Sequence, residues 1–380
     1  MSYTVKAVAS IQEIGQQVWD SCAHPAGTEV DPFVGFAFLN ALEQSGSVAA
    51  ETGWAPYHLV LESETQDTVA VMPLYLKSHS QGEYIFDYSW ADAFQRAGGN
   101  YYPKFLSAVP FTPATGRRLL SRSNELNDYL SEGLRTVSEE LGVSSVHLNF
   151  VNQEQWQALG KLGWLQRTHK QYHWLNQGYA DFEDFLSYLS SKKRKNIRRE
   201  RRDARANDIE IELLTGSDLR EHHWDSFYEF YIDTGNRKWG RPYLTREFFS
   251  LVGQHMADRI LLIMCRRAGS YVAGAINFIG DSCLFGRNWG CIEDHPFLHF
   301  EVCYYQAIEY AISHKLARVE AGAQGEHKLA RGYLPTETYS AHWIAHSGFK
   351  EAVDRFLKEE RTHVSEEIDY IEQYSPFRKT

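Results

Sequence analysis

Cysteine is scarce in this chain, and its few cysteines lack the spacing of a metal site or a disulfide framework. Five cysteines among 380 residues are an odd number, and none forms a closely spaced pair. Zinc modules and disulfide-rich secreted domains are built from such pairs, so the pattern argues against both classes. We expect reduced cysteines in the core of a cytoplasmic protein, and no metal site.

The sequence also lacks long hydrophobic runs and an excess of positive charge. No apolar stretch approaches the ~20 residues that a membrane-spanning helix needs, and the N-terminal residues do not resemble a signal peptide. The net charge of −10 at pH 7 disfavours a general attraction to nucleic acid or anionic lipid. We therefore expect no transmembrane segment and no DNA partner, and any anionic ligand must meet a local basic patch.

Residue-level repetition is also missing, although the chain is long enough for two domains with full cores. A hydrophobic content of 43% and a charged content of 23% are typical of folded globular proteins. Aromatic residues reach 14%, which suits either well-packed cores or grooves for large amphipathic ligands. Any claim of an internal duplication therefore depends on the order of the predicted elements alone.

That order is the same in both halves: a strand, two helices, a hairpin, a helix and a strand. In the first half we expect them at 3–7, 11–22, 36–42, 57–77, 124–141 and 145–150. In the second half we expect them at 209–214, 223–234, 245–256, 271–291, 300–311 and 318–322. The pattern predicts an α/β protein of the α+β type, with two tandem domains that each hold a mixed, mostly antiparallel sheet flanked by helices. The expected ranges are 1–178, a basic linker helix at 179–207, and 208–380 with a C-terminal helical tail.

The linker carries the highest density of charge in the sequence. We expect one long helix over 182–205, in which KKRKNIRRERR supplies eight basic residues. Such a helix repels itself unless an anion or an acidic surface faces it. The candidate phosphate- or RNA-binding residues are Lys192, Arg194, Lys195, Arg198, Arg199 and Arg202. Two alternatives are a solvated helix paired with the protein's own acids and a membrane-surface role, for which an exposed apolar face is missing.

Two further stretches of the first half hold candidate binding residues. The segment TGRR leads into a predicted helix, where Arg117 and Arg118 could hold a phosphate with the backbone amides. An ordinary helix cap explains the same residues. In the aromatic-rich stretch before it, Tyr102 and Lys104 are candidate substrate-binding residues, unless the aromatic side chains only cover the hairpin.

The second half gathers acids, bases and cations around its last strand. Arg287 and Trp289 end a hairpin strand, and His299 and Glu301 flank the start of the following helix, which also carries Tyr304. Beyond the strand at 318–322 lies a loop that is dense in ionisable groups. The candidate residues there are Glu320, Glu326, His327, Lys328 and Arg331. Such density favours a ligand site over a solvated loop, although salt-bridged neighbours could also hold the loop in place.

Six segments carry a resemblance that covers most of the chain: HSQGEYIFDYSWADAFQRAGGNYYPK, VPFTPATGRRLL, LSSKKRKNIRRERR, TGNRKWGRPYLTR, GRNWGCIEDHPFLHFEVCYYQAIEYAI and VEAGAQGEHKLARGY. With them the chain resembles the FemAB-like branch of the GNAT acyltransferase superfamily, described as peptidoglycan biosynthesis or recognition proteins. The resemblance implies two GNAT-like domains and a relation to Fem-type transferases. Those enzymes pass an amino acid from aminoacyl-tRNA to the stem peptide of a cell-wall precursor. The chain lacks the acetyl-CoA loop of ordinary GNAT enzymes.

The residues and the resemblance together support transfer of an acyl or aminoacyl group to an amine. The amine must lose a proton, and the tetrahedral oxyanion must be stabilised. We expect Glu320 as the base, His327 as its orienting partner and Lys328 as the cation that stabilises the oxyanion. Acyl-CoA or aminoacyl-tRNA is the expected co-substrate, with no tightly bound cofactor. The alternative is a non-catalytic module of the same fold that binds cell-wall precursors or RNA.

Overall fold

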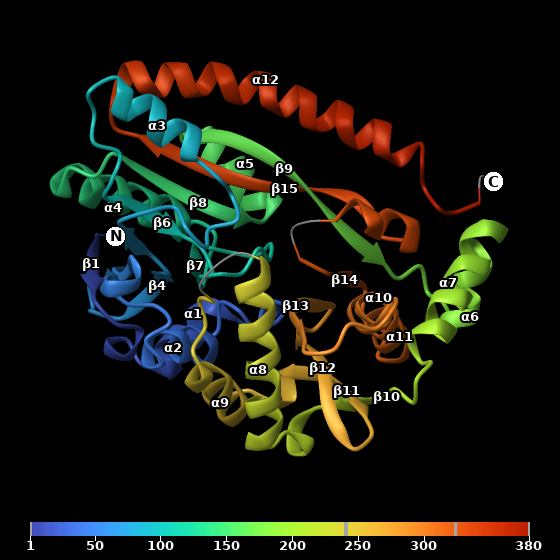
Figure 1. Cartoon of the computed structure of the whole chain (residues 1–380). Coiled ribbons are helices and arrows are strands. Elements are labelled where there is room, and N and C mark those ends of the chain that lie inside the picture. Colours follow the sequence, from blue (N-terminus) through green and yellow to red (C-terminus); the bar gives the residue numbers. More distant parts are fainter. Residues whose placement is uncertain (1, 239–241, 323–324, 379–380) are drawn as a thin grey trace. The chain divides into compact units, whose positions relative to one another are not determined.

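The computed structural model describes residues 2–238, 242–322 and 325–378, which form two compact units (Figure 1). The first unit comprises Met1–Lys170 with Glu337–Glu366, and the second comprises Gln171–Thr336 with Glu367–Thr380. This grouping differs from the expected ranges, because residues 337–366 belong with the first unit and residues 171–207 belong with the second. The pairing of the strands explains both differences.

The first unit is built on two sheets. The smaller one is antiparallel, in the order β1-β3-β4-β7, from Tyr3–Val8 (β1), His58–Ser63 (β3), Thr68–Met72 (β4) and Leu120–Ser121 (β7). The larger one runs in the order β15-β8-β6-β5-β2, from Leu334–Ile344 (β15), Ser145–Val151 (β8), Lys104–Ser107 (β6), Tyr75–Lys77 (β5) and Trp54–Pro56 (β2). Strands β6 and β8 are parallel. Residues 339–344 of β15 pair with β8, which places this late segment in the first unit.

Helices cover these sheets with their apolar faces. They are Gln16–Ala23 (α1), Phe36–Gln44 (α2), Tyr88–Arg96 (α3), Leu126–Leu141 (α4), Gln153–Lys161 (α5) and Ser347–Glu372 (α12), the last forming the expected helical tail. Leu130 and Leu134 of α4 pack against Leu59 and Leu61 of β3 in one fully buried cluster. The single helix expected over 11–22 is wrong, because Gly15 has a φ of 79° and separates a short 3₁₀ turn from α1. The helix expected after TGRR is also wrong, since those residues lead into β7.

The second unit holds one mixed sheet in the order β10-β11-β12-β13-β14-β9. Its strands are Glu210–Leu214 (β10), Ile260–Arg267 (β11), Ser270–Ile279 (β12), Cys283–Cys291 (β13), Arg318–Glu320 (β14) and the end of Leu165–Leu175 (β9). Strands β13 and β14 are parallel, and the other neighbours are antiparallel. The expected hairpin and the parallel strand are confirmed, whereas β11 was not expected.

Helices pack on both faces of this sheet because its central strands are apolar on both sides. Glu221–Lys238 (α8) lies so close to β13 that a Cβ at Gly290 would stand 2.3 Å from the backbone of Phe230. Gln306–Ser313 (α11) covers the other face of the sheet. Its Ala307 and Ile308 belong to the same buried cluster as Ile263 of β11. Arg246–His255 (α9) packs on α8, while Leu298–Phe300 (α10) and a π-helical turn at Glu301–Tyr305 lead into α11.

The basic region forms two helices, so the single helix expected over 182–205 is wrong. Phe182–Tyr188 (α6) ends where Leu189 adopts an extended conformation, and Ser191–Ala204 (α7) begins after Ser190. The break buries Leu189 completely and lets it form a β-bridge with Phe377. In the described part of the chain, no helix has the length and the apolar character needed to cross a bilayer.

Candidate functional site

The candidate site of the second unit lies where two parallel strands stop pairing. Strands β13 and β14 are hydrogen-bonded only from Cys283 to Phe285, opposite Arg318 to Glu320. Strand β14 then ends, while β13 continues to Cys291 along β12. The β12–β13 register shifts at Asn277, which leaves Arg287 as the extra residue of a β-bulge. Bulges of this kind re-aim side chains and often accompany functional sites.

Glu320 ends β14 as a buried carboxylate with one unsatisfied oxygen. Its residue is 4% exposed, and its Oε1 accepts a hydrogen bond from Arg318 Nε at 3.0 Å. Its Oε2 has no hydrogen-bond partner in the described structure. His173 Nε2 lies 4.0 Å from Oε2, which is too long for a hydrogen bond. A buried carboxylate oxygen without a donor is costly, and such groups are concentrated at functional sites.

His173 was not predicted, and it faces Glu320 from the neighbouring strand β9. Its Nε2 lies 3.1 Å from Gln171 Oε1. Burial lowers the pKa of His173, with Arg318 and Lys328 acting in the same direction and Glu320 opposing them. The imidazole is therefore neutral at pH 7, and His173 lies within electrostatic reach of both Glu320 and Lys328. The sequence signal was the run of polar residues in β9, which local patterning could not connect to β14.

Lys328 is an almost completely buried lysine in the 3₁₀ helix Glu326–Arg331, which follows β14. Its ammonium group donates a hydrogen bond to the carbonyl of Gly322 at 2.8 Å. Burial lowers the pKa of Lys328 to about 8. A lysine in this range is mostly protonated at pH 7 and can still exchange its proton, as catalytic acids and bases require.

An aromatic cluster lies next to this lysine. The hydroxyl of Tyr304 and Nε2 of His327 are 2.8 Å apart, and the His327 ring is 5.5 Å from that of Phe300. The His299 ring lies 5.5 Å from Tyr304 and 5.4 Å from Trp289. The structure therefore brings four predicted residues, Trp289, His299, Tyr304 and His327, into one group. Burial lowers the pKa of His327 and raises that of Tyr304.

Arg331 and Glu301 both contact other side chains of the protein. The guanidinium of Arg331 stacks 3.5 Å from the Phe300 ring centre and donates to Glu200 of α7. Glu301 has no exposed surface, and its carboxylate accepts hydrogen bonds from Arg201, Arg205 and Gln306. Glu301 therefore anchors α7 and cannot contact a substrate in this structure. Glu326 is exposed, and Arg287 is partly buried at the bulge.

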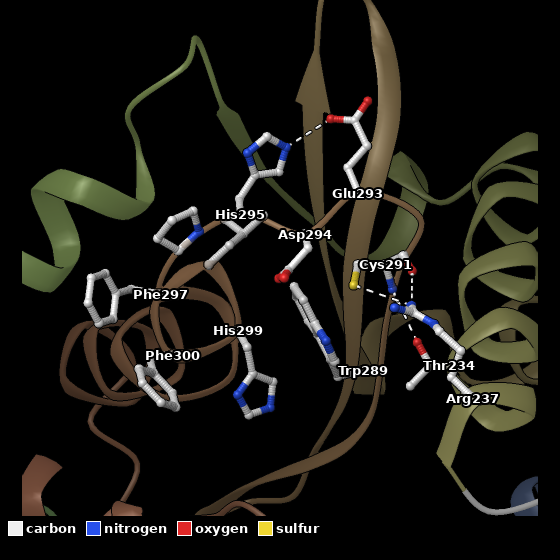
Figure 2. Close-up of a pocket in the computed structure, with 12 residues that line it drawn as sticks. Thr234, Arg237, Trp289, Cys291, Glu293, Asp294, His295, Phe297, His299 and Phe300 are labelled. Carbon is white, nitrogen blue, oxygen red and sulfur yellow. Dashed lines mark hydrogen bonds and ion pairs between the residues drawn. The ribbon is translucent and has the colours of Figure 1, made fainter.

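A pocket of about 400 Å³ opens beside the end of β13 (Figure 2). It is lined by the end of α8, the last residues of β13, the loop before α10 and α10 itself. Its lining includes Thr234, Arg237, Trp289, Cys291, Asp294 and His299. Because His299 belongs both to this pocket and to the aromatic cluster, the pocket borders the group around His327.

The cations of α7 divide into paired and unpaired groups. Arg198 is paired with Glu183, Arg202 with its neighbour Asp203, and Arg194 donates to the carbonyl of Ser187. Three exposed side chains have no hydrogen bond or ion pair to any described residue: Lys192, Lys195 and Arg199. A shallow cavity of about 580 Å³ is lined by Arg194, Lys195, Arg198, Arg199 and Arg202. This surface, here called the α7 basic face, keeps an unneutralised positive charge.

The first unit contains a buried charged cluster around Lys104, which was predicted as a substrate-binding residue. Lys104 is completely buried, and its ammonium group donates to Ser80 at 2.8 Å, to Glu83 at 2.8 Å and to Asp87. Lys104 therefore cannot contact a substrate in this structure. Lys77 lies 4.0 Å from Glu83.

Histidines and a tyrosine extend this cluster. Tyr101 donates to Asp87 at 2.7 Å, and Nδ1 of His147 lies 2.7 Å from Nδ1 of His342. Burial brings the pKa of both Lys77 and Glu83 to about 7, and lowers that of His147 to about 3 and that of His342 well below its usual value. The alternation of β5, β6, β8 and β15 places Lys77, Lys104, His147 and His342 on one face of the sheet.

The other candidate residues of the first unit also form hydrogen bonds within the protein. Arg118 has no exposed surface and donates to the carbonyls of Asn149, Arg117 and Ala114. Arg117 donates to the carbonyls of Ala23 and Ser121. The hydroxyl of Tyr102 lies 2.8 Å from Ser80 Oγ. Across the described residues of the chain, no group of three or more His, Cys, Asp or Glu side chains is placed to hold a metal ion.

Comparison with solved structures defines the fold class. The chain is similar to FemX with a TM-score of 0.56 at 11% sequence identity, over 93% of this chain and 100% of that one. It is also similar to L-PGS from Bacillus licheniformis, with a TM-score of 0.51 at 10% identity, over 87% of this chain and 98% of the other. These likenesses confirm the expected mixed α/β fold of tandem GNAT-like domains.

The family follows from the sequence as a whole. The family model FemAB-like, described as peptidoglycan biosynthesis/recognition, matches residues 10–379. The chain therefore belongs to the FemAB-like family, as the resemblance of the six segments indicated. No curated protein matches the sequence significantly.

Proposed function

We propose that the chain is an acyltransferase or aminoacyltransferase that moves an acyl group from an activated ester or thioester to the amine of a cell-wall precursor. The observation that carries this proposal is the burial of two ionisable groups, one at the end of β14 and the other in the 3₁₀ helix that follows it. Glu320 keeps one oxygen without a donor, and Lys328 has a pKa of about 8. Membership of a family described by peptidoglycan biosynthesis or recognition supports the choice of acceptor.

The two groups suit the two demands of acyl transfer to an amine. The amine nitrogen attacks the acyl carbon and forms a C–N bond, and the unpaired oxygen of Glu320 accepts the proton that the ammonium loses. The ammonium of Lys328 stabilises the negative oxygen of the tetrahedral intermediate, a role typically worth about 3–4 kcal/mol for one well-placed donor. The C–O or C–S bond to the carrier then breaks, and the leaving oxygen or sulfur takes up a proton. No nucleophilic serine or cysteine is needed.

The α7 basic face supports a polyanionic donor such as aminoacyl-tRNA. Lys192, Lys195 and Arg199 are exposed and unpaired in the described structure, so their charges are available to phosphates. The same helix is tied to the site through Glu200, which accepts a hydrogen bond from Arg331 at 2.9 Å. The donor's phosphates and the reacting groups would therefore be held by one connected set of elements.

The proposal is tested by single-turnover assays with purified protein. Charged tRNA mixtures and acyl-CoAs are offered as donors with UDP-linked cell-wall precursors as acceptors, and acylated products are identified by mass spectrometry. We expect transfer from at least one donor and a rate that is at least a hundredfold lower in Lys328→Ala. A protein that binds precursor or tRNA but transfers nothing from any donor would instead be the non-catalytic binding module.

A further inference from the structure

The charged residues that line the pocket beside β13 leave one negative charge without a partner. Among its lining residues, Arg237 is paired with Asp233 at 2.5 Å and donates to the carbonyl of Cys291 at 2.6 Å. Glu293 is paired with Arg267 at 2.7 Å and lies 2.8 Å from His295 Nε2 (Figure 2). These contacts neutralise one cation and one anion of the lining.

Asp294 is the charged residue of the lining that these contacts do not neutralise. It is exposed and lines the pocket, and it has no hydrogen bond or ion pair to any described residue. Its carboxylate lies in the same part of the pocket as the indole of Trp289 (Figure 2). Phe297, His299 and Phe300 add further ring surface to the lining.

From this combination we infer that the pocket binds an aliphatic ammonium group. Aromatic faces attract cations through their negative quadrupole, and a nearby carboxylate adds a direct charge pair. A phosphate is disfavoured in the same place, because the carboxylates of Glu293 and Asp294 both line the pocket and would repel it. The pocket therefore selects a protonated amine over the diphosphate of a coenzyme.

The position of the pocket relates this ammonium group to the reacting groups. His299 lines the pocket and also packs 5.5 Å from Tyr304 and 6.3 Å from His327, whose neighbour in sequence is Lys328. A ligand held by Asp294 would thus extend along the aromatic cluster toward Lys328. This inference rests on the proposed function for its meaning, since the ammonium belongs either to the amine acceptor or to the amino acid of an aminoacyl donor.

The test measures binding alone, by saturation-transfer NMR titration of the full chain with n-butylammonium and with n-butanol as its neutral counterpart. We expect butylammonium to bind with an affinity that falls as salt is raised, and butanol to bind more weakly. Asp294→Asn should weaken butylammonium about fivefold, and Trp289→Leu by a similar factor. Asp294→Glu should restore most of the affinity. Asp218→Asn is the matched control, because Asp218 is exposed and outside the pocket.

Two further probes distinguish the source of the ammonium. Nα-acetyl-lysine amide represents the side-chain amine of an acceptor, and alaninamide represents the α-ammonium of an aminoacyl donor. Preference for the first assigns the pocket to the acceptor, and preference for the second assigns it to the donor. Equal binding of butanol and butylammonium, or an unchanged affinity in Asp294→Asn, overturns the inference. Acyl transfer by a protein without ammonium binding would overturn this subsite alone, whereas ammonium binding without transfer would overturn only the proposed function.

Discussion

Arg331 and Glu200 form a largely buried ion pair in which a guanidinium nitrogen lies 2.9 Å from Glu200 Oε2. The same oxygen accepts a hydrogen bond from the Tyr305 hydroxyl, and Arg331 also stacks on Phe300. Three elements therefore meet at one carboxylate: helix α7, the π-helical turn and the 3₁₀ helix that carries Lys328. The pair fixes the basic helix against the loop with the candidate catalytic residues.

Loss of this pair should destabilise the second unit. Arg331→Met leaves a buried carboxylate without its cation, which typically costs about 3 kcal/mol of unfolding free energy. Urea denaturation followed by circular dichroism measures the change. Arg198→Met is the control, because it removes an exposed pair with Glu183 and should leave the unfolding curve unchanged. Equal effects of the two substitutions would contradict the structural role of Arg331.

Burial of Lys328 predicts an increase of stability at alkaline pH. Its pKa is lowered to about 8 in the folded chain, so between about pH 8 and pH 10.5 the unfolded state binds more protons than the folded state. The free energy of unfolding therefore rises as the pH increases from about 8 to 10.5, and this gain is lost again as the pH falls through 8. Between pH 7.5 and pH 9.5, wild type should gain about 1–2 kcal/mol relative to Lys328→Met. A constant difference between the two proteins across this range would show that Lys328 is not desolvated.

The local pattern of the sequence predicted the hairpin of β12 and β13, the crossover helix and the parallel strand β14. These elements have strong hydrophobic periodicity and clear turn residues. The pattern missed β11, although ILLIMC is strongly apolar, because a short run that is buried on both faces has no alternation to distinguish a strand from a helix. It also missed the break at Leu189, which depends on a bridge to Phe377 near the other end of the chain.

The candidate site shows the same division between local and long-range information. Trp289, His299, Tyr304 and His327 were predicted from density along the sequence, and they meet in space. His173 could not be predicted, because its position opposite Glu320 follows from the pairing of β9 with β14. Nor could the burial of Lys104, since its partners Glu83 and Asp87 come from a loop that carries no periodic signal.

The buried histidines of the first unit predict acid sensitivity. His147 has a pKa lowered to about 3, so folding keeps this imidazole neutral, whereas an unfolded histidine takes up a proton near pH 6.5. Stability from this group is present above pH 6.5 and is lost as pH falls toward 3. Between pH 6.5 and pH 5, wild type should lose about 2 kcal/mol more unfolding free energy than His147→Gln. Parallel pH profiles for the two proteins would contradict this account.

The unpaired cations of the α7 basic face predict salt-dependent RNA binding. Lys195→Glu combined with Arg199→Glu should abolish binding of fluorescent tRNA, because each neutralised phosphate releases counterions. The melting temperature should stay the same, since neither side chain has a partner in the described structure. Lys161→Glu with Lys315→Glu makes the same change of net charge elsewhere and should leave binding intact. A large drop in melting temperature would show instead that these cations stabilise the fold.

Substitutions of Glu320 and Lys328 should affect catalysis in different ways. Lys328→Ala should lower turnover by a factor of about 200 to 900, because it removes a donor to the oxyanion that is worth about 3–4 kcal/mol. Glu320→Gln should lower turnover mainly below the pKa of the amine acceptor, where a base is needed, and the loss should shrink as pH rises and the amine deprotonates on its own. The two substitutions are therefore distinguished by the pH profile of the single-turnover rate constant, measured with an identified donor. His173→Gln tests the neighbouring histidine in the same assay, and it should shift the acid limb of that profile without removing activity, since its Nε2 lies 4.0 Å from Glu320 Oε2. Full turnover in both Lys328→Ala and Glu320→Gln would place the chemistry outside the end of strand β14.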